Sequence, residues 1–281
     1  MERIRVERLD PLGIIAGVIK DLGIIEAIDE RIPTDNREEI TTGEAIAGMI
    51  INGLGFSNRP MTLTPQFFEN KPLEILFRPE VTREHFNRLK LGRSLDRIYN
   101  YGCDLLFSEV AKNVIEPEGV SLRFNCLDTT RFSLTGKYDS SSDEPAMVLT
   151  HGLSSDHRPD LKQAILELMV SQDGGVPFLS KSWDGNTSDN EVFQARRKEL
   201  IFQFAASPTP RYLIADSKLS TEENAASLAR LPFITRVPAT LKVEQQLIAQ
   251  AFEIERWQQL NDTTRFTRVE ICHYGIEQRW L

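Results

Sequence analysis

The chain has 281 residues and a formal net charge of -8 at pH 7, with 41% hydrophobic and 26% charged residues. This composition is typical of a folded globular protein, and the length suits two ordinary domains or one large one. The acidic balance argues against an indiscriminate nucleic-acid binder, which needs clustered Lys and Arg to neutralise phosphates.

The sequence shows no targeting or membrane-spanning segment, and its cysteines do not suggest disulfides. The chain has no run of about 18 apolar residues, and its first residues, MERIRVERLD, lack the apolar core of a signal peptide. Its cysteines (Cys103, Cys126 and Cys272) are widely spaced and form no C-x-x-C pair, so neither a disulfide framework nor a zinc site is indicated. We expect a cytoplasmic protein with no membrane partner.

Residues 1–117 are predicted to form a helical domain. An apolar stripe from Leu12 to Leu22 recurs at helical spacing and closes at Gly23. Residues 41–44 match a capping box at the start of a second helix. Phe67 and Phe68 are expected to anchor a proline-rich stretch, and one longer helix is predicted over residues 84–105.

That longer helix carries Lys90, Arg93 and Arg97 on one face, which suits contacts with DNA phosphates. The alternative is a solvated face of long basic side chains, and we favour it because runs of charge usually lie on the surface. The three residues remain candidates for DNA binding.

After Val120 the apolar period becomes strand-like, so residues 118–281 are predicted to form a second domain. Strands are predicted over residues 120–135, in AMVLTHGLS and in LKQAILELMV, and Asp173-Gly174 predicts a hairpin into the next strand. The following predictions are a helix over 191–204, strand RYLIADS, a helix capped by Ser220 and Glu223, strand FITRV, a helix over 241–260 and strand-like TRFTRVEICHY.

Two carboxylates stand out by position. In FNCLDTTRFSLTG, residues 124–136, Asp128 shares the period-two phase of the apolar Phe124, Cys126 and Phe132, so a charge is expected among hydrocarbon neighbours. Asp216 ends a later apolar strand. A strand meander, a helix and a fourth strand, with Asp on the first and fourth, is the order of the ribonuclease-H-like fold, where these two strands are neighbours.

Such a pair of carboxylates suits divalent metal. Two Mg²⁺ ions about 4 Å apart activate an attacking water or 3′-hydroxyl and stabilise the leaving oxygen in phosphoryl transfer. Mg²⁺ prefers a few hard oxygen ligands from protein. Taken singly, Asp128 is more often the mark of a bulge and Asp216 of a turn.

A polar segment, GLSSDHRPDLKQ, places His157, Arg158 and Lys162 between two predicted strands. It suits phosphate positioning, and a polar turn broken by Pro159 explains it equally well. WDGNTSDNE is interpreted first as a structural segment, a loop that leads into a helix with Ser188 or Asp189 as its N-terminal cap. The sequence contains no G-x-S-x-G, H-E-x-x-H, P-loop or G-x-G-x-x-G motif.

Several motifs together resemble a known family. LDTTRFSLTGKY, GLSSDHRPDLKQ, VPFLSKSWDGNTSD, ADSKLSTEEN and FITRVPATLK are similar to bacterial insertion-sequence transposases of the IS-four superfamily, in the branch named sixteen-thirty-four. TTGEAIAGMIINGLGFSNRP and FFENKPLEILF resemble the helical domain of unknown function that precedes the catalytic domain in these proteins. HFNRLKLGRSLD departs from the Asn-Asp-Asp-type stretch of relatives.

The resemblance implies an α+β chain whose helical N-terminal domain precedes a ribonuclease-H-like DDE transposase domain. Asp128 and Asp216 match the first two acidic residues, which hold Mg²⁺ or Mn²⁺. The implied partners are double-stranded DNA, as terminal inverted repeats and target, and further copies of the chain on that DNA.

The third acidic residue is the departure. Relatives carry it in a Val-Glu-Arg-like motif on a later helix, and the strand-like surroundings of Glu270 and Glu277 do not match. The chain ends at IEQRWL without a closing helix, so we expect a truncated copy whose third carboxylate lies beyond residue 281. The alternatives are a non-catalytic regulator that binds DNA ends or a full-length partner, and a ribonuclease-H-like nuclease.

Overall fold

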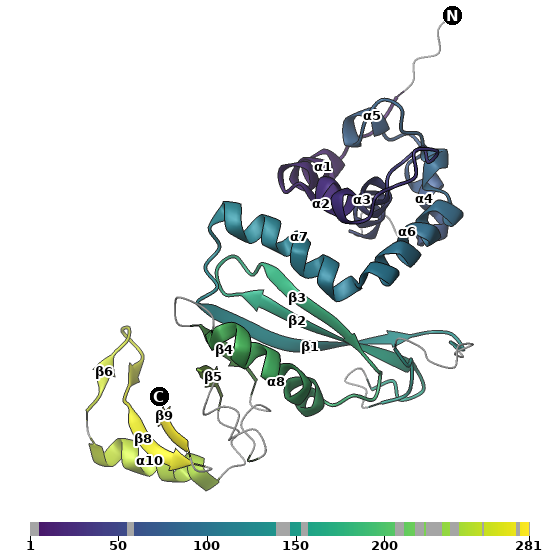
Figure 1. Cartoon of the computed structure of the whole chain (residues 1–281). Helices are drawn as coiled ribbons and strands as arrows, with labels where there is room; N and C mark the ends of the chain where they lie inside the picture. The colour runs from purple at the N-terminus through teal and green to yellow at the C-terminus, as the bar shows by residue number, and fades with distance from the viewer. Residues whose placement is uncertain are drawn as a thin grey trace, which may run out of the picture. The chain divides into compact units, whose positions relative to one another are not determined.

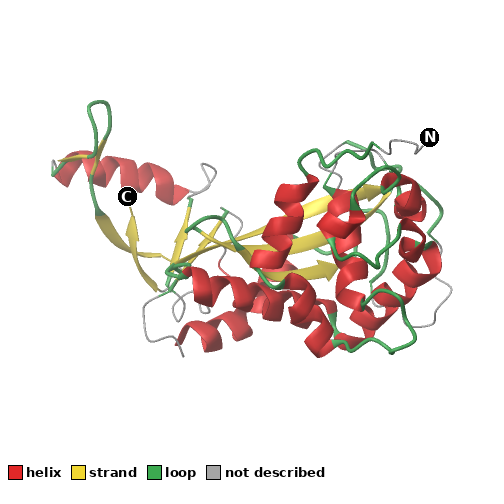
Figure 2. Cartoon of the chain, turned by 90° about the horizontal axis from the view of Figure 1, so that it is seen from above, coloured by secondary structure: helices red, strands yellow, loops and turns green. Residues whose placement is uncertain are grey.

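The structure, a computed structural model, divides the chain into two compact units, residues 1–120 and 121–281. The first ends three residues after the predicted boundary. The described part of the first unit consists of helices and loops, whereas the strands belong to the second (Figure 2). The structure describes residues 6–54, 59–138, 147–152, 157–205, 211–216, 222, 232–236, 242–254, 256–273 and 276–280.

The first unit is built from short helices around one apolar centre. They are α1 (Leu12–Asp21), α2 (Ile24–Arg31), α3 (Thr42–Gly53), η1 (Met61–Leu63), α4 (Thr64–Phe67), α5 (Leu73–Leu76), η2 (Arg83–Phe86), α6 (Arg88–Tyr101) and α7 (Cys103–Glu118). Phe68 and Phe86 are almost fully buried there, with ring centroids 4.7 Å apart. The predicted anchoring by Phe67 and Phe68 is therefore confirmed.

The predicted capping box begins α3. Thr41 Oγ1 accepts a hydrogen bond from the Glu44 backbone N–H at 3.0 Å, and Glu44 Oε2 accepts one from the Thr41 N–H at 2.8 Å. Two donors that the helix itself leaves without partners are thereby satisfied. The local pattern was sufficient to place this helix start.

The single helix predicted over residues 84–105 is wrong. The Asn87 side chain accepts a bond from the Lys90 N–H and starts α6 separately from η2. Gly102 then has a φ of 110°, which an L side chain rarely adopts, and it divides α6 from α7. Leu105, the last residue of the predicted helix, is 52% exposed.

The second unit contains a five-stranded mixed sheet (Figure 1). The strands lie in the order β3-β2-β1-β4-β5 and comprise β1 (Phe124–Leu134), β2 (Lys162–Ser171), β3 (Pro177–Trp183), β4 (Tyr212–Ala215) and β5 (Phe233–Thr235). β1 pairs antiparallel with β2 and parallel with β4, and β4 pairs parallel with β5. The α+β prediction is confirmed.

The hairpin predicted at Asp173-Gly174 joins β2 to β3, as expected. The strand predicted in AMVLTHGLS is wrong for the described residues 147–152, where only Thr150 forms an isolated bridge, to Gln163. The segment is held by other bonds instead: Gly185 N–H donates to the Val148 carbonyl at 3.0 Å, and Asp184 accepts from the Val148 N–H at 2.7 Å. Without it, β4 is the fourth strand of the sheet.

Helix α8 (Asp189–Ala205) packs on one face of this sheet (Figure 1). Leu127, Met169 and Leu213 are buried against Phe193 and Leu200 of α8. The buried carboxylate of Glu167 on β2 joins this interface by an ion pair with Arg196 at 2.9 Å. The indole N–H of Trp183 donates to the same carboxylate at 2.8 Å.

The position of α8 corrects the expected environment of Asp128. The buried residues of β1 are Asn125 and Leu127, whose phase faces α8. Asp128 is exposed on the opposite phase, and Phe132, which shares it, is 49% exposed. The charge is therefore not placed among buried hydrocarbon neighbours, because successive strand residues point to opposite faces.

The remaining described elements are α10 (Lys242–Ile254), β6 (Gln258–Gln259), β7 (Arg265–Phe266), β8 (Val269–His273) and β9 (Ile276–Trp280). The helix predicted over 241–260 is wrong for the described residues 256–260, because Gln258 and Gln259 pair with β7 across a turn. The predicted cap at Ser220 and Glu223 lies outside the described residues. Within the described residues, no helix has the length and apolarity needed to span a membrane.

Candidate active site around Asp128 and Asp216

Asp128 lies in β1, and Asp216 directly follows the last residue of the neighbouring parallel strand β4. Phe124 of β1 is paired with Tyr212 of β4. Asp128 lies four residues after Phe124, and Asp216 lies four residues after Tyr212. Neighbouring strands lie about 4.8 Å apart, and residues four positions on share a face. The ladder ends at Cys126 and Ile214, so the two aspartates flank the point where the strands part.

A small cavity of about 40 Å³ lies at this point, and both aspartates line it. Its other lining residues come from β1, α8 and the end of β4: Leu127, Thr129, Asp189, Val192, Phe193 and Ala215. The Thr235 hydroxyl of β5 donates to the Asp216 carbonyl at 2.7 Å and so holds the chain where β4 ends. The volume suffices for a few waters or small ions, since one water needs about 10–15 Å³ of such space.

A third carboxylate, Asp189, also lines this cavity. Asp189 is the first residue of α8, and its Oδ1 accepts bonds from the Thr129 hydroxyl at 2.5 Å and from Arg131 at 3.3 Å. The cap of α8 is Ser188, whose hydroxyl accepts from the Glu191 N–H at 3.2 Å. The Ser188 backbone N–H in turn donates to Glu191 and lowers the pKa of that carboxyl.

Sequence patterns did not single out Thr129 or Arg131, and they offered Asp189 only as an alternative cap. The one signal was the polar run WDGNTSDNE before α8. The contacts of Asp189 with β1 span about sixty residues of chain, so no local pattern encodes them.

The donor set at the cavity fits a hard divalent ion. Carboxylate oxygens are the protein ligands that Mg²⁺ and Mn²⁺ take, with waters or phosphate oxygens completing the shell. Within the described ranges, however, no three His, Cys, Asp or Glu side chains are close enough together to hold a metal. Any ion here would have Asp128 and Asp216 as its candidate protein ligands.

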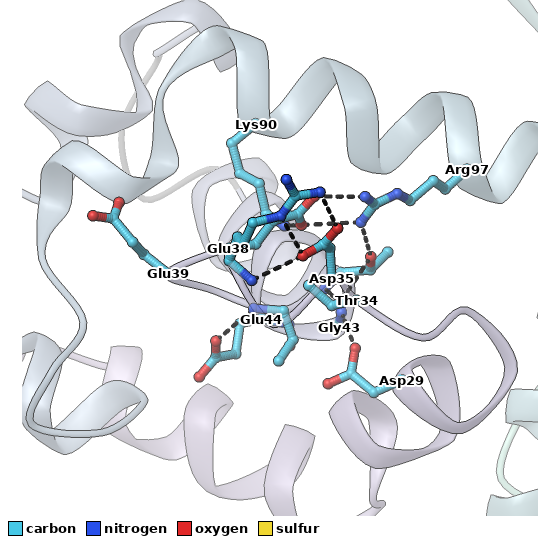
Figure 3. A network of polar contacts seen from close by, with 12 residues as sticks. Asp29, Thr34, Asp35, Glu38, Glu39, Gly43, Glu44, Lys90 and Arg97 are labelled. Carbon is cyan, nitrogen blue, oxygen red and sulfur yellow. Dashed lines mark hydrogen bonds and ion pairs between the residues drawn. The ribbon is translucent and has the colours of Figure 1, made fainter.

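Two of the basic residues proposed for DNA contact are engaged inside the first unit. Glu38 binds Lys90 at 2.5 Å and Arg97 at 2.5 Å and 3.0 Å, as Figure 3 shows. The Arg97 hydrogen bonds lower the pKa of the Glu38 carboxyl against the effect of burial, with Lys90 adding to the same direction. Arg93 is exposed on α6. A DNA contact through these residues stays a prediction, and for Lys90 and Arg97 it has to compete with Glu38.

The other predicted phosphate contacts lie apart from the lining of the cavity. His157 is exposed and has a φ of 56°, and Arg158 forms two hydrogen bonds with Asp160 at 2.8 and 2.6 Å. These bonds with Arg158 lower the pKa of Asp160. Lys162 Nζ donates to the Tyr138 carbonyl at 3.1 Å. A DNA contact through His157, Arg158 and Lys162 stays a prediction.

The two C-terminal glutamates lie in a separate two-stranded sheet. Glu270 on β8 forms an exposed ion pair with Arg279 at 2.9 Å, and Glu277 belongs to β9. Glu270 is not among the described residues that line the cavity of Asp128 and Asp216.

Comparison with known proteins gives a match for the first unit. The family model "Domain of unknown function (DUF4277)" matches residues 4–112, in agreement with the predicted helical domain of unknown function. No curated protein matches the chain.

Two solved structures show a distant similarity. One is "Mos1 transposase paired-end complex with left transposon end", with 11% identity, a TM-score of 0.27, and coverage of 79% of this chain and 67% of that chain. The other is "Crystal structure of a pre-cleavage Mos1 transpososome", with 10% identity, a TM-score of 0.24, and coverage of 86% and 84%. Both TM-scores are too low to establish a shared fold.

Proposed function

We propose that this chain is a transposase of the DDE type, with a ribonuclease-H-like second unit that acts on the ends of an insertion sequence. One observation carries the proposal: Asp128 of β1 and Asp216, which directly follows β4, each lie two residues beyond the last pair of the parallel β1–β4 ladder and line one cavity. The sequence motifs that resemble IS-four transposases of the sixteen-thirty-four branch include both residues. The strand order β3-β2-β1-β4-β5 suits the same proposal.

In this proposal Asp128 and Asp216 hold Mg²⁺ or Mn²⁺, and double-stranded DNA with terminal inverted repeats is the substrate. The bound metal would activate the attacking oxygen and stabilise the leaving oxygen at the scissile phosphate. The chain's own contribution is to present two carboxylates at the point where the paired strands β1 and β4 part. Assembly of several copies on the DNA ends belongs to the same proposal.

The first test is Mn²⁺ binding by calorimetry, combined with a nicking assay on DNA that carries the terminal repeats. Asp128→Asn and Asp216→Asn should each lose metal binding and nicking, because each substitution removes a charged oxygen ligand. Asp262→Asn changes an exposed turn residue away from the cavity and should behave as wild type. Nicking that survives Asp128→Asn would refute the assignment of that residue.

The alternative is a non-catalytic protein that binds DNA ends. One observation favours it: the described residues offer no third His, Cys, Asp or Glu that completes a metal-binding group. End-specific binding without Mn²⁺-dependent nicking would support this alternative over the enzyme.

A further inference from the structure

Asp189, Arg131 and Thr129 form a connected set of contacts beside the candidate metal site. Arg131 and Thr129 both donate to Asp189 Oδ1. The Thr129 backbone N–H donates in turn to Asp128 Oδ1 at 2.8 Å. A hydrogen-bonded path therefore runs from the start of α8 to the carboxylate of Asp128. We call Thr129, Arg131 and Asp189 the α8 clasp.

The clasp is not needed to begin the helix. Ser188 and Glu191 already satisfy the backbone donors at the start of α8 through a reciprocal pair of bonds. The contacts of Asp189 with β1 come in addition to that cap. Their structural effect is to tie the first turn of α8 to the strand at Thr129.

One buried polar atom of the clasp has no hydrogen-bond partner among the described residues. Arg131 and Asp189 side chains are only 14% and 16% exposed. Arg131 Nε is buried and has no hydrogen-bond partner among the residues that the structure describes. A buried donor without an acceptor costs stability, so the arrangement calls for an explanation other than stability alone.

The geometry points to a positioning role. Side chains of Thr129 and Asp128 leave the strand on opposite faces, so Asp189 acts on Asp128 through the Thr129 backbone. We propose that the α8 clasp orients the Asp128 carboxylate for metal, with Asp189 and Arg131 as positioning residues and Thr129 as the link. This inference rests on the proposed metal site of Asp128 and Asp216.

The test measures Mn²⁺ affinity of the full chain by calorimetry, with folding of each variant checked by circular dichroism. Thr129→Val keeps the size and branching of the side chain but removes the hydroxyl, and it should weaken Mn²⁺ binding about 10–100-fold. Thr129→Ser keeps the hydroxyl and should retain the wild-type affinity. This matched pair decides the question even if Asp189→Asn fails to fold.

Arg131→Gln separates positioning from direct ligation. If Asp189 positions Asp128, Arg131→Gln and Asp189→Asn should both weaken Mn²⁺ binding. If Asp189 itself binds the ion, Arg131→Gln should leave the affinity unchanged or raise it, because a competing cation is removed, and the proposal would be overturned.

Two further outcomes are distinguishable. Wild-type affinity in Thr129→Val, alongside lost binding in Asp128→Asn, overturns the clasp proposal and leaves the proposed function standing. A wild-type chain that binds no Mn²⁺ overturns both proposals.

Discussion

Single residues set the closest contacts in the first unit, and Gly43 is the clearest case. Its backbone N–H donates to Asp29 Oδ1 at 2.6 Å, a contact drawn in Figure 3. A Cβ at Gly43 would lie 2.5 Å from the Ile25 carbonyl oxygen and 3.0 Å from the Ile25 Cα, both of them backbone atoms of α2. Because neither can rotate away, α2 and α3 would have to separate.

We therefore expect Gly43→Ala to lower the free energy of unfolding by about 1–3 kcal/mol, the usual cost of overpacking. Gly17→Ala is the matched control, since Gly17 is also helical but has no atom within 4 Å of its added Cβ. That control should stabilise the protein by about 0.5–1 kcal/mol. Urea unfolding followed by circular dichroism measures both, and equal stability of the two variants would contradict the close approach.

At the scale of elements, Glu38 connects the segment before α3 to helix α6. Its side chain is 22% exposed and faces Lys90 and Arg97, which are 12% and 31% exposed. Glu38→Gln should cost about 1–3 kcal/mol at pH 7, because charge-assisted hydrogen bonds are lost. Glu39→Gln is the control: Glu39 is 74% exposed, and its pair with His85 should contribute at most about 1 kcal/mol.

The effect of Glu38→Gln should depend on pH. Arg97 lowers the folded-state pKa of Glu38 below its ordinary value of 4.5. The stability from the carboxylate is then fully present above pH 4.5 and is lost as the pH falls through the lowered pKa. Unfolding of wild type and variant at pH 7 and at successively lower pH measures this. A difference that stays constant below pH 4.5 would rule out the ionised carboxylate as its source.

The same elements show how far sequence patterns reach. The capping box at Thr41 was predictable because its donors and acceptors lie within four residues. The break at Gly102 was missed because the apolar spacing on its two sides fits one helix equally well. The environment of Asp128 was misjudged for a different reason: both faces of β1 carry apolar residues, and only the placement of α8 decides which face is buried.

For the whole molecule, the strand order brought Asp128 and Asp216 together as the sequence predicted, whereas the Asp189 contacts with β1 depend on tertiary packing.

Each unit also has an apolar core of its own. Among the described residues, the core of the first unit consists of residues before Val120, and Gly119 ends α7 in a left-handed conformation. The first unit therefore contains the burial and the helix termini that it needs to fold alone.

We expect a fragment of residues 1–120 to fold cooperatively, with a helical circular dichroism spectrum and a single thermal transition.

A fragment of residues 1–101 is the matched control, because it lacks α7. Leu106 of α7 is buried against Ile28 and Ile32, and losing a buried Leu side chain typically costs about 2–5 kcal/mol. The shorter fragment also loses the ion pair of Arg31 with Glu109 at 2.6 Å, so its melting temperature should fall clearly below that of residues 1–120. An unfolded longer fragment, or equal melting of the two, would show that the first unit depends on contacts from the rest of the chain or that α7 is not part of its core.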